Sequence, residues 1–269
     1  MDEVGPAALT ASGITKMTRT VAIANQKGGV GKTTTAINLA AALALSEKRV
    51  LLIDSDPQGN AGSGLGFPGL KVPKGIYEVL VGGMPITEAI VETEIAGLHL
   101  VPSGQRLVGA EIELADAEKR EYKLKTALEQ IQDRYDFILI DAPPSLGFLT
   151  INALTAARSV LVPVQCEYYA LEGLSHLLAA IRLVQQALNP NLQIEGVLLT
   201  MFDNRLNLSQ QVLAETRRFF AERVYQTVIP RNVRLSEAPS FGKPVVTYDP
   251  ACTGSTSYMS LAREVIERG

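Results

Sequence analysis

The sequence predicts an α/β fold, a doubly wound and mostly parallel β-sheet flanked by helices. Short apolar runs rich in β-branched residues alternate along the chain with longer segments of helical periodicity, and parallel strands need such crossover helices. A glycine-rich loop joins the first apolar run to the first helical segment. The chain has 269 residues, of which 46% are hydrophobic, so it can bury one sizeable core.

The predicted strands are apolar runs that end in polar or turn-forming residues. We place them at Val21–Ala24, Arg49–Ile53, Leu98–Pro102, Asp136–Asp141, Ser159–Val164, Ile194–Thr200 and Val224–Ile229. The predicted helices have apolar residues three and four positions apart. They cover Thr33–Leu45, Ile76–Val81, Pro85–Val91, Glu111–Gln132, a long helix ending at Leu188, about Leu208 to Glu222, and Ser255–Arg268. We interpret the glycine-rich stretch Ala61–Gly75 as a mobile surface segment.

We expect residues 18–269 to form a single domain, because α/β folds of this size are commonly one unit. Residues 1–17 are small and polar and are expected to be a disordered extension. No stretch approaches the roughly 20 apolar residues of a membrane span, so we expect no membrane association. Two cysteines, Cys166 and Cys252, cannot form a disulfide framework, which is typical of a reducing cytosol.

The stretch Lys27–Thr34 has the composition of a phosphate-binding loop. Its three glycines allow positive φ angles and let backbone N–H groups approach an anion. The loop leads into a helix N-terminus, whose dipole favours negative charge. Lys32 would place a positive charge beside the β- and γ-phosphates, and the Thr33 hydroxyl would bind Mg²⁺.

Carboxylates follow two other predicted strands. Asp54 and Asp56 come directly after Arg49–Ile53, and Asp141 closes Asp136–Asp141. Ligands of open α/β sheets bind beyond the carboxyl ends of the strands. A carboxylate there can position water or Mg²⁺ beside a γ-phosphate, and Asp141 fits the position that holds Mg²⁺, usually through water.

Positive charge is concentrated between Arg205 and Arg234. This segment has six arginines, no lysine and two acids, although the whole chain carries a net charge of −3. Arginine side chains suit phosphate oxygens, and such contacts do not depend on nucleic-acid sequence. A solvated helix face whose arginine stems cover apolar surface explains the composition equally well, so both interpretations stay open.

Several stretches together resemble one family, the ParA-type partition ATPases, and most closely its chromosomal Soj branch. The first is a deviant Walker A motif with a lysine at each end, in which Gln26 stands where the usual P-loop has its first glycine. The matching stretches are Lys27–Thr34, Asp54–Asn60, Ile138–Leu146, Gln165–Leu174 and Val228–Lys243. The likeness runs from about residue 18 to the C-terminus and implies a deviant P-loop NTPase fold.

The resemblance implies an Mg²⁺-dependent ATPase, slow without its partner, that forms an ATP-sandwich homodimer. Lys27 would reach across to the partner's nucleotide, and Asp56 would orient the attacking water with support from Asp54. The implied catalytic residues are Lys27, Lys32, Asp54 and Asp56, and the implied Mg²⁺ ligands are Thr33 and Asp141. The implied ATP-binding residues are Lys27, Gly28, Gly29, Val30, Gly31, Lys32, Thr33, Thr34, Met201, Pro230 and Asn232.

The resemblance also implies that the ATP-bound dimer binds double-stranded DNA without sequence preference and releases it on hydrolysis. Arg205 and Arg234 match basic positions that relatives use for DNA, and Arg218 is inferred from its neighbourhood. Family members bind a ParB-type centromere protein that stimulates hydrolysis. The expected partners are therefore a second copy, DNA and such a protein, and the expected location is the nucleoid in the cytoplasm.

Two alternatives share the phosphate-binding loop. A membrane-cycling, division-site positioning ATPase would need a C-terminal amphipathic anchor. In Ser255–Arg268, however, two arginines are offset by two glutamates, which favours docking on the core. An iron–sulfur protein of the nitrogenase-reductase type would need two suitably placed cysteines in each chain. Cys166 lies instead in a stretch that resembles Soj proteins, and Cys252 lies near the C-terminus.

Overall fold

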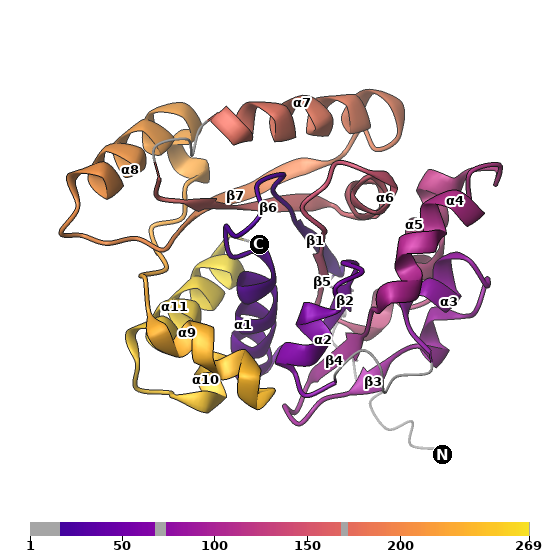
Figure 1. Cartoon of the computed structure of the whole chain (residues 1–269), viewed down its shortest axis with the longest axis horizontal. Coiled ribbons are helices and arrows are strands. Elements are labelled where there is room, and N and C mark those ends of the chain that lie inside the picture. Colours follow the sequence, from indigo (N-terminus) through magenta and orange to yellow (C-terminus); the bar gives the residue numbers. More distant parts are fainter. Residues whose placement is uncertain (1–16, 68–73, 168–171, 269) are drawn as a thin grey trace, which may run out of the picture.

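A computed structural model of the chain describes residues 17–67, 74–167 and 172–268, and its centre is a twisted sheet (Figure 1). The strands of the described residues are β1 (Arg19–Ile23), β2 (Val50–Asp54), β3 (Val91–Glu92), β4 (Leu98–Val101), β5 (Phe137–Asp141), β6 (Ser159–Gln165) and β7 (Gln193–Thr200). They lie in the order β3-β4-β2-β5-β1-β6-β7. Strand β3 runs antiparallel to β4, and all other neighbours are parallel. The predicted fold class is confirmed.

Helices cover both faces of this sheet. The α-helices are α1 (Lys32–Leu45), α2 (Asn60–Gly64), α3 (Ile76–Leu80), α4 (Ala110–Glu113), α5 (Lys123–Glu129), α6 (Phe148–Ala156), α7 (Glu172–Ala187), α8 (Asn207–Phe220), α9 (Val233–Glu237), α10 (Val245–Tyr248) and α11 (Thr253–Glu267). The 3₁₀ turns are η2 (Ile86–Glu88), η3 (Gln105–Gly109), η4 (Arg120–Tyr122), η5 (Gln132–Arg134), η6 (Ala221–Arg223) and η7 (Ala238–Phe241). Helices α3, α5, α6 and α7 pack on one face, and α1, α10 and α11 pack on the other.

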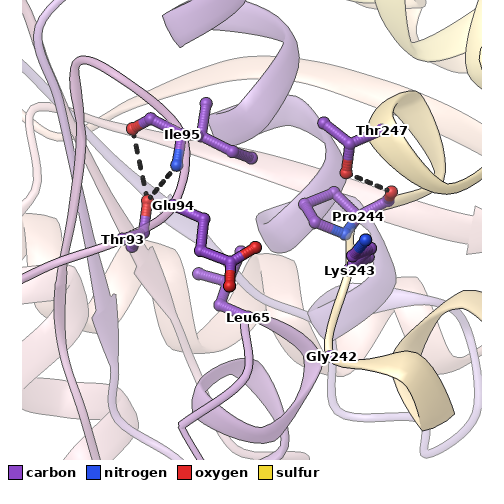
Figure 2. A pocket seen from close by; sticks show the side chains of 8 residues that line it. All are labelled: Leu65, Thr93, Glu94, Ile95, Gly242, Lys243, Pro244 and Thr247. Atoms are coloured by element: carbon purple, nitrogen blue, oxygen red, sulfur yellow. Dashed lines mark hydrogen bonds between the residues drawn. The ribbon is translucent and has the colours of Figure 1, made fainter.

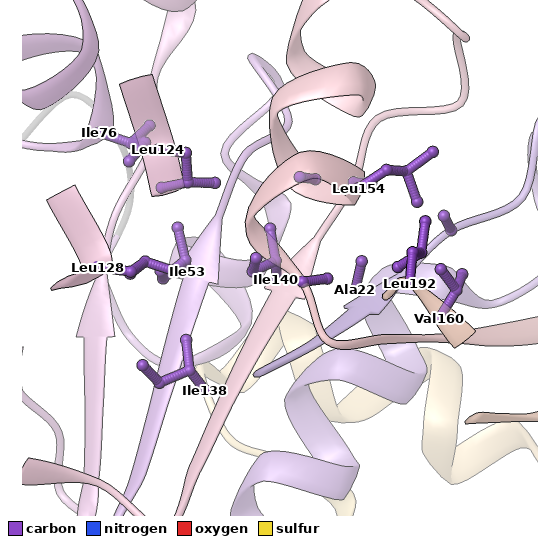
Figure 3. Packing of buried hydrophobic residues seen from close by; sticks show 14 of the residues in the cluster. Ala22, Ile53, Ile76, Leu124, Leu128, Ile138, Ile140, Leu154, Val160 and Leu192 are labelled. Carbon is purple, nitrogen blue, oxygen red and sulfur yellow. The ribbon is translucent and has the colours of Figure 1, made fainter. Parts of the chain in front are cut away.

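Strand residues alternate between two hydrophobic cores, because successive side chains of a strand point to opposite faces. On β1, Ala22 belongs to the core under α5 and α6, which Figure 3 shows with Leu124 and Leu154. Ile23 belongs to the core under α1 and α11. Burial on both faces explains why these strands are apolar throughout rather than alternating with polar residues.

The last helix, α11, packs against α1. Tyr258 and Leu261 are buried in this contact, and the Tyr258 hydroxyl lies 3.2 Å from the Thr35 Oγ1 of α1. The apolar face of the C-terminal helix is therefore docked on the core, as its balanced charges predict. In the described part of the chain, no helix is long and apolar enough to cross a bilayer.

The predicted strand Val224–Ile229 does not form, so this prediction was wrong. Isolated bridges join Val224 to Val197 and Pro230 to Phe202. Between them, the backbone N–H groups of residues 226 and 227 donate to the two carboxylate oxygens of Glu264, at 2.8 and 3.0 Å. A side chain of α11 thus takes the hydrogen bonds that a strand ladder would need.

Other helix predictions need correction. Glu111–Gln132 is not one helix, because it divides into α4, η4 and α5 around Lys119, whose left-handed φ of 52° an α-helix cannot contain. Pro85–Val91 contains a 3₁₀ turn and then enters β3. The stretch Ala61–Gly75 was predicted as a mobile surface segment, but it begins inside helix α2, where Ala61, Gly62 and Gly64 are buried. Residues 68–73 of this stretch lie outside the described residues. The predicted extension at residues 1–17 also lies outside them, apart from Met17.

Candidate active site

The phosphate-binding loop lies between β1 and α1, at the carboxyl edge of the sheet. Gly29 and Gly31 have φ angles of 74° and 86°, which side chains rarely tolerate. Gly31 is the N-cap of α1. A methyl group at Gly28 or Gly29 would meet no atom within 4 Å, so this side of the loop is open. The loop therefore has the backbone conformation and free space that a bound anion needs.

Two polar residues that the sequence analysis did not single out hold this loop in place. Asn25 is buried, its Nδ2 donates to the Pro163 carbonyl at 2.7 Å, and its Oδ1 accepts the Lys27 N–H at 3.0 Å. Thr200, at the end of β7, donates from Oγ1 to the Val30 carbonyl at 2.8 Å. Both residues close apolar strand runs, and this is the sequence signal that could have identified them.

The two lysines of the loop have different environments. The Lys32 residue is 7% exposed, and its Nζ donates to the Lys27 carbonyl at 3.2 Å. Burial lowers the pKa of Lys32, and Asp141 and Asp56 oppose this shift. Lys27 is more exposed, and its Nζ lies 3.1 Å from Glu167 Oε2 of the same chain. A role of Lys27 at a partner's nucleotide stays a prediction.

Asp54 and Asp141 occupy the ends of neighbouring strands and are register partners between β2 and β5. Asp141 is fully buried, and no hydrogen bond among the described residues reaches either of its carboxylate oxygens. Burial, followed by the charge of Asp54, raises the pKa of Asp141 well above its usual range, and the Thr33 side chain opposes this shift. Unpartnered carboxylate oxygens beside a hydroxyl are a donor set that suits a hard cation such as Mg²⁺.

Asp54 and Asp56 have different hydrogen bonds. Asp54 accepts the Asp56 N–H on Oδ1 at 3.2 Å and the Gly62 N–H on Oδ2 at 3.0 Å. Burial raises the pKa of Asp54 to about 7 despite these backbone donors. Asp56 Oδ1 accepts the Gln58 N–H at 3.0 Å, and no described residue donates to its Oδ2. Asp54 thus fixes the turn, and Asp56 keeps one oxygen available for water.

A cleft of about 460 Å³ lies next to the loop. Gly31 and Thr34 line it together with Met201, Pro230 and Asn232, so the structure brings the expected ATP-binding residues of distant segments together. Met201 has a left-handed φ of 52°, an uncommon conformation that often marks functional sites. The volume is typical of a pocket for a small-molecule ligand.

The three candidate DNA-binding arginines are exposed and separate from the buried carboxylates. The Arg205 guanidinium donates two hydrogen bonds to the Asp203 carboxylate, at 2.9 and 2.6 Å. Arg234 pairs with Glu237 at 2.8 Å and with Asp249 at 3.2 Å. Arg218 is on α8, which lies on the same side of the molecule as α9 in Figure 1. The structure therefore presents these arginines on the surface.

Comparisons with known proteins identify the family of the chain. Residues 18–194 match the model of a family described as an AAA domain. The chromosome partitioning protein ParA of Myxococcus xanthus is 56% identical over 250 residues, which cover 93% of this chain and 88% of that protein. The sporulation initiation inhibitor protein Soj of Bacillus subtilis is 57% identical over 253 residues, which cover 94% of this chain and all of that protein. The chain belongs to the ParA/Soj family of chromosome-partitioning ATPases.

Solved structures extend the ParA/Soj assignment to the fold. A cobyrinic acid a,c-diamide synthase of Mycobacterium smegmatis, solved with an ATP analogue and magnesium, is 39% identical and has a TM-score of 0.84. The match covers 93% of this chain and 94% of that one. The cell-division ATPase MinD of Pyrococcus furiosus is 24% identical, covers 94% of this chain and all of that one, and has a TM-score of 0.77, which shows a shared fold.

Proposed function

We propose that the chain is an Mg²⁺-dependent ATPase that acts as a DNA-binding switch in chromosome or plasmid partitioning. ATP closes a sandwich homodimer, the dimer binds double-stranded DNA without sequence preference, and hydrolysis stimulated by a ParB-type partner releases it. Membership of the ParA/Soj family supports the partitioning role. One observation carries the ATPase proposal: the buried Asp141 ends β5, the strand beside β1, and the phosphate-binding loop that follows β1 leads into α1 at the buried Lys32.

The side chains of the site divide the work of phosphoryl transfer. The backbone N–H groups of the loop and the N-terminus of α1 receive the phosphates, and Lys32 neutralises their charge. Asp56 uses its free oxygen to orient the attacking water in line with the γ-phosphate. Asp54 holds the Asp56 backbone in place from its buried position. Lys27 supplies a second positive charge from the partner subunit during phosphoryl transfer.

The residues present fit Mg²⁺. Asp141 has two buried oxygens without hydrogen-bond partners among the described residues, and Thr33 supplies a hydroxyl beside it. When bound, the ion would neutralise charge that develops on the phosphates. Burial keeps the Asp141 carboxyl fixed and excludes competing water from its oxygens.

The arginines of the exposed surface provide the proposed DNA contacts. Arg205, Arg218 and Arg234 are accessible to a large partner, and phosphate contacts need no base-specific geometry. Two of these residues lie in surface ion pairs, which exchange readily for other anions. The apolar face of α11 packs against α1, which supports DNA rather than a membrane as the surface that is bound.

Binding to random-sequence duplex DNA with ATP, ADP or no nucleotide tests the proposal. We expect ATP-dependent, salt-sensitive binding that is lost in Arg205→Glu and in Arg234→Glu. Arg263→Glu is the matched control, because it changes the same charge at an exposed position of α11. An ATP-dependent dimer without DNA affinity would shift support to membrane cycling, which flotation with liposomes of anionic lipid would then test.

A further inference from the structure

Helix α2 physically joins the nucleotide site to the segment that carries Arg234. We propose that α2 transmits the state of the nucleotide site to α9 through a close backbone contact between Gly66 and Gly242, and so regulates DNA affinity. This regulation rests on the proposed ATP-dependent DNA binding and names its structural path.

The first turn of α2 is fixed to the site by Asp54. Its Oδ2 accepts the Gly62 N–H at 3.0 Å, and its Oδ1 accepts the Asp56 N–H at 3.2 Å. One buried carboxylate therefore holds both the turn that orients water and the start of α2. A shift of the Asp56 backbone on binding a γ-phosphate is passed to α2, because the two share this anchor.

The body of α2 lies tightly between α1 and η7. A methyl group at Gly64 would lie 2.5 Å from Ile37 Cδ1 of α1 and 3.9 Å from Pro239 of η7. Such a close approach leaves no freedom for α2 to move without displacing a neighbour. Movement of α2 therefore reaches η7, which directly follows α9 in the chain.

The residues after α2 make the closest contact with this segment. A methyl group at Gly242 would lie only 2.8 Å from the Gly66 Cα and 3.1 Å from the Gly66 nitrogen. Both glycines have left-handed φ angles, 86° at Gly66 and 64° at Gly242, so neither can be replaced without strain. The backbones meet without intervening side chains.

The contact has a fixed side and an open side. The Val245 N–H donates to Asn38 Oδ1 of α1 at 2.7 Å, which anchors the chain just beyond Gly242. On the other side, Figure 2 shows Leu65 facing Gly242 and Pro244 across a cleft of about 110 Å³. The cleft leaves Gly242 room to move with Gly66, whereas the hydrogen bond at Val245 holds the chain beyond it, so a displacement of Gly66 passes toward η7 and α9.

The segment that receives the movement holds Arg234. This arginine pairs with Glu237 at the end of α9 and with Asp249 after α10, at 2.8 and 3.2 Å. Gly242 lies between these two carboxylates in the chain. A displacement at Gly242 changes the position of one carboxylate relative to the other, and thereby the availability of Arg234 to a phosphate.

Two glycine variants separate the contact from simple backbone strain. Gly242→Ala places a methyl against Gly66, whereas Gly83→Ala imposes the same strain, φ 65°, at a site with no atom within 4 Å. The measurement is the affinity for random-sequence duplex DNA with ATP and with ADP, at fixed salt, for the full chain. ATP affinity and ATP-dependent dimerisation are measured alongside.

We expect Gly242→Ala to bind ATP and dimerise within about twofold of the wild type, and the ratio of DNA affinities in ATP and ADP to fall by about fivefold or more. By thermodynamic reciprocity, the effect of DNA on ATP affinity must fall by the same factor. A merely structural defect would instead lower ATP affinity or dimerisation, or lower DNA affinity with ATP and with ADP alike. Gly83→Ala should keep the wild-type ratio.

An unchanged ratio in Gly242→Ala, or an equal loss in Gly83→Ala, overturns the inference and leaves the proposed function intact. Absence of ATP-dependent DNA binding in the wild type overturns both. Should Gly242→Ala fail to fold, hydrogen exchange of the wild-type chain tests the same contact through the Gly242 amide, which donates to the Pro239 carbonyl at 3.0 Å. A different exchange rate of this amide with ATP and with ADP supports the path, and an unchanged rate overturns it.

Discussion

The nucleotide end of the molecule and its arginine surface hold their charges in opposite ways. At the nucleotide end, Lys32 is buried at the start of α1 and Asp141 at the end of β5, and each offsets the charge of the other. On the arginine surface, the Arg205 side chain is 84% exposed and is held by a neighbour two residues away. Removing a buried charge leaves its partner uncompensated, whereas a surface ion pair contributes little and is screened by salt. Substitutions at the two ends should therefore differ greatly in effect.

The largest effect should come from Lys32→Ala. We expect ATP affinity to fall by at least about 100-fold, because the variant leaves Asp56 and Asp141 without their buried cation. Calorimetric titration with ATP and Mg²⁺ measures this. Lys125→Ala, a change of the same type on α5, is the control. An affinity within threefold of the wild type would contradict the assigned role.

Asp56→Ala should keep ATP binding and lower turnover by about 100-fold, because the attacking water loses its acceptor. Phosphate release measures the rate, and sedimentation with duplex DNA should show a trapped, ATP-bound dimer. Asp116→Ala removes an exposed carboxylate outside the site and should change neither quantity. Normal turnover by Asp56→Ala would contradict the role assigned to this residue.

The different burial of the two cysteines, Cys166 and Cys252, can be tested without any substitution. Burial raises the pKa of the Cys166 thiol to about 12, so at pH 8 almost none of it is the reactive thiolate. Cys252 is half-buried and precedes α11. We expect iodoacetamide to modify Cys166 at least about tenfold more slowly, as followed by mass spectrometry. Unfolding in urea should equalise the rates, and equal rates in the folded chain would refute the burial.

The smallest effect should come from Asp203→Asn, which releases Arg205 from its ion pair. We expect DNA affinity to rise by about two- to fivefold at low salt and the gain to vanish at high salt. Arg205 lowers the pKa of Asp203 to about 2, so the pair is lost only as the pH falls toward that value. The gain should therefore be constant between pH 6 and 8. Weaker DNA binding would instead show that Asp203 orients Arg205 for DNA.

The sequence predicts the nucleotide end better than the rest because its signals are local. The loop glycines, and the acids that follow apolar strands, are recognised from the few residues around them. The pairing of Asp54 with Asp141 depends on strand order, which no single segment encodes. The lost strand at Val224–Ile229 depends on Glu264, which is distant in sequence. Helix α2 was missed because its glycines also suit a turn.

Tyr258 belongs to the last helix of the chain and yet lines the cleft beside the phosphate-binding loop, which is near the start. This residue of α11 lines the cleft beside the loop and contacts Thr35 of α1. All strands of the described sheet precede α11 in the chain. On the ribosome, the phosphate-binding loop therefore emerges long before the tyrosine that completes its cleft. A nascent chain would therefore complete this cleft only after α11 has folded against α1.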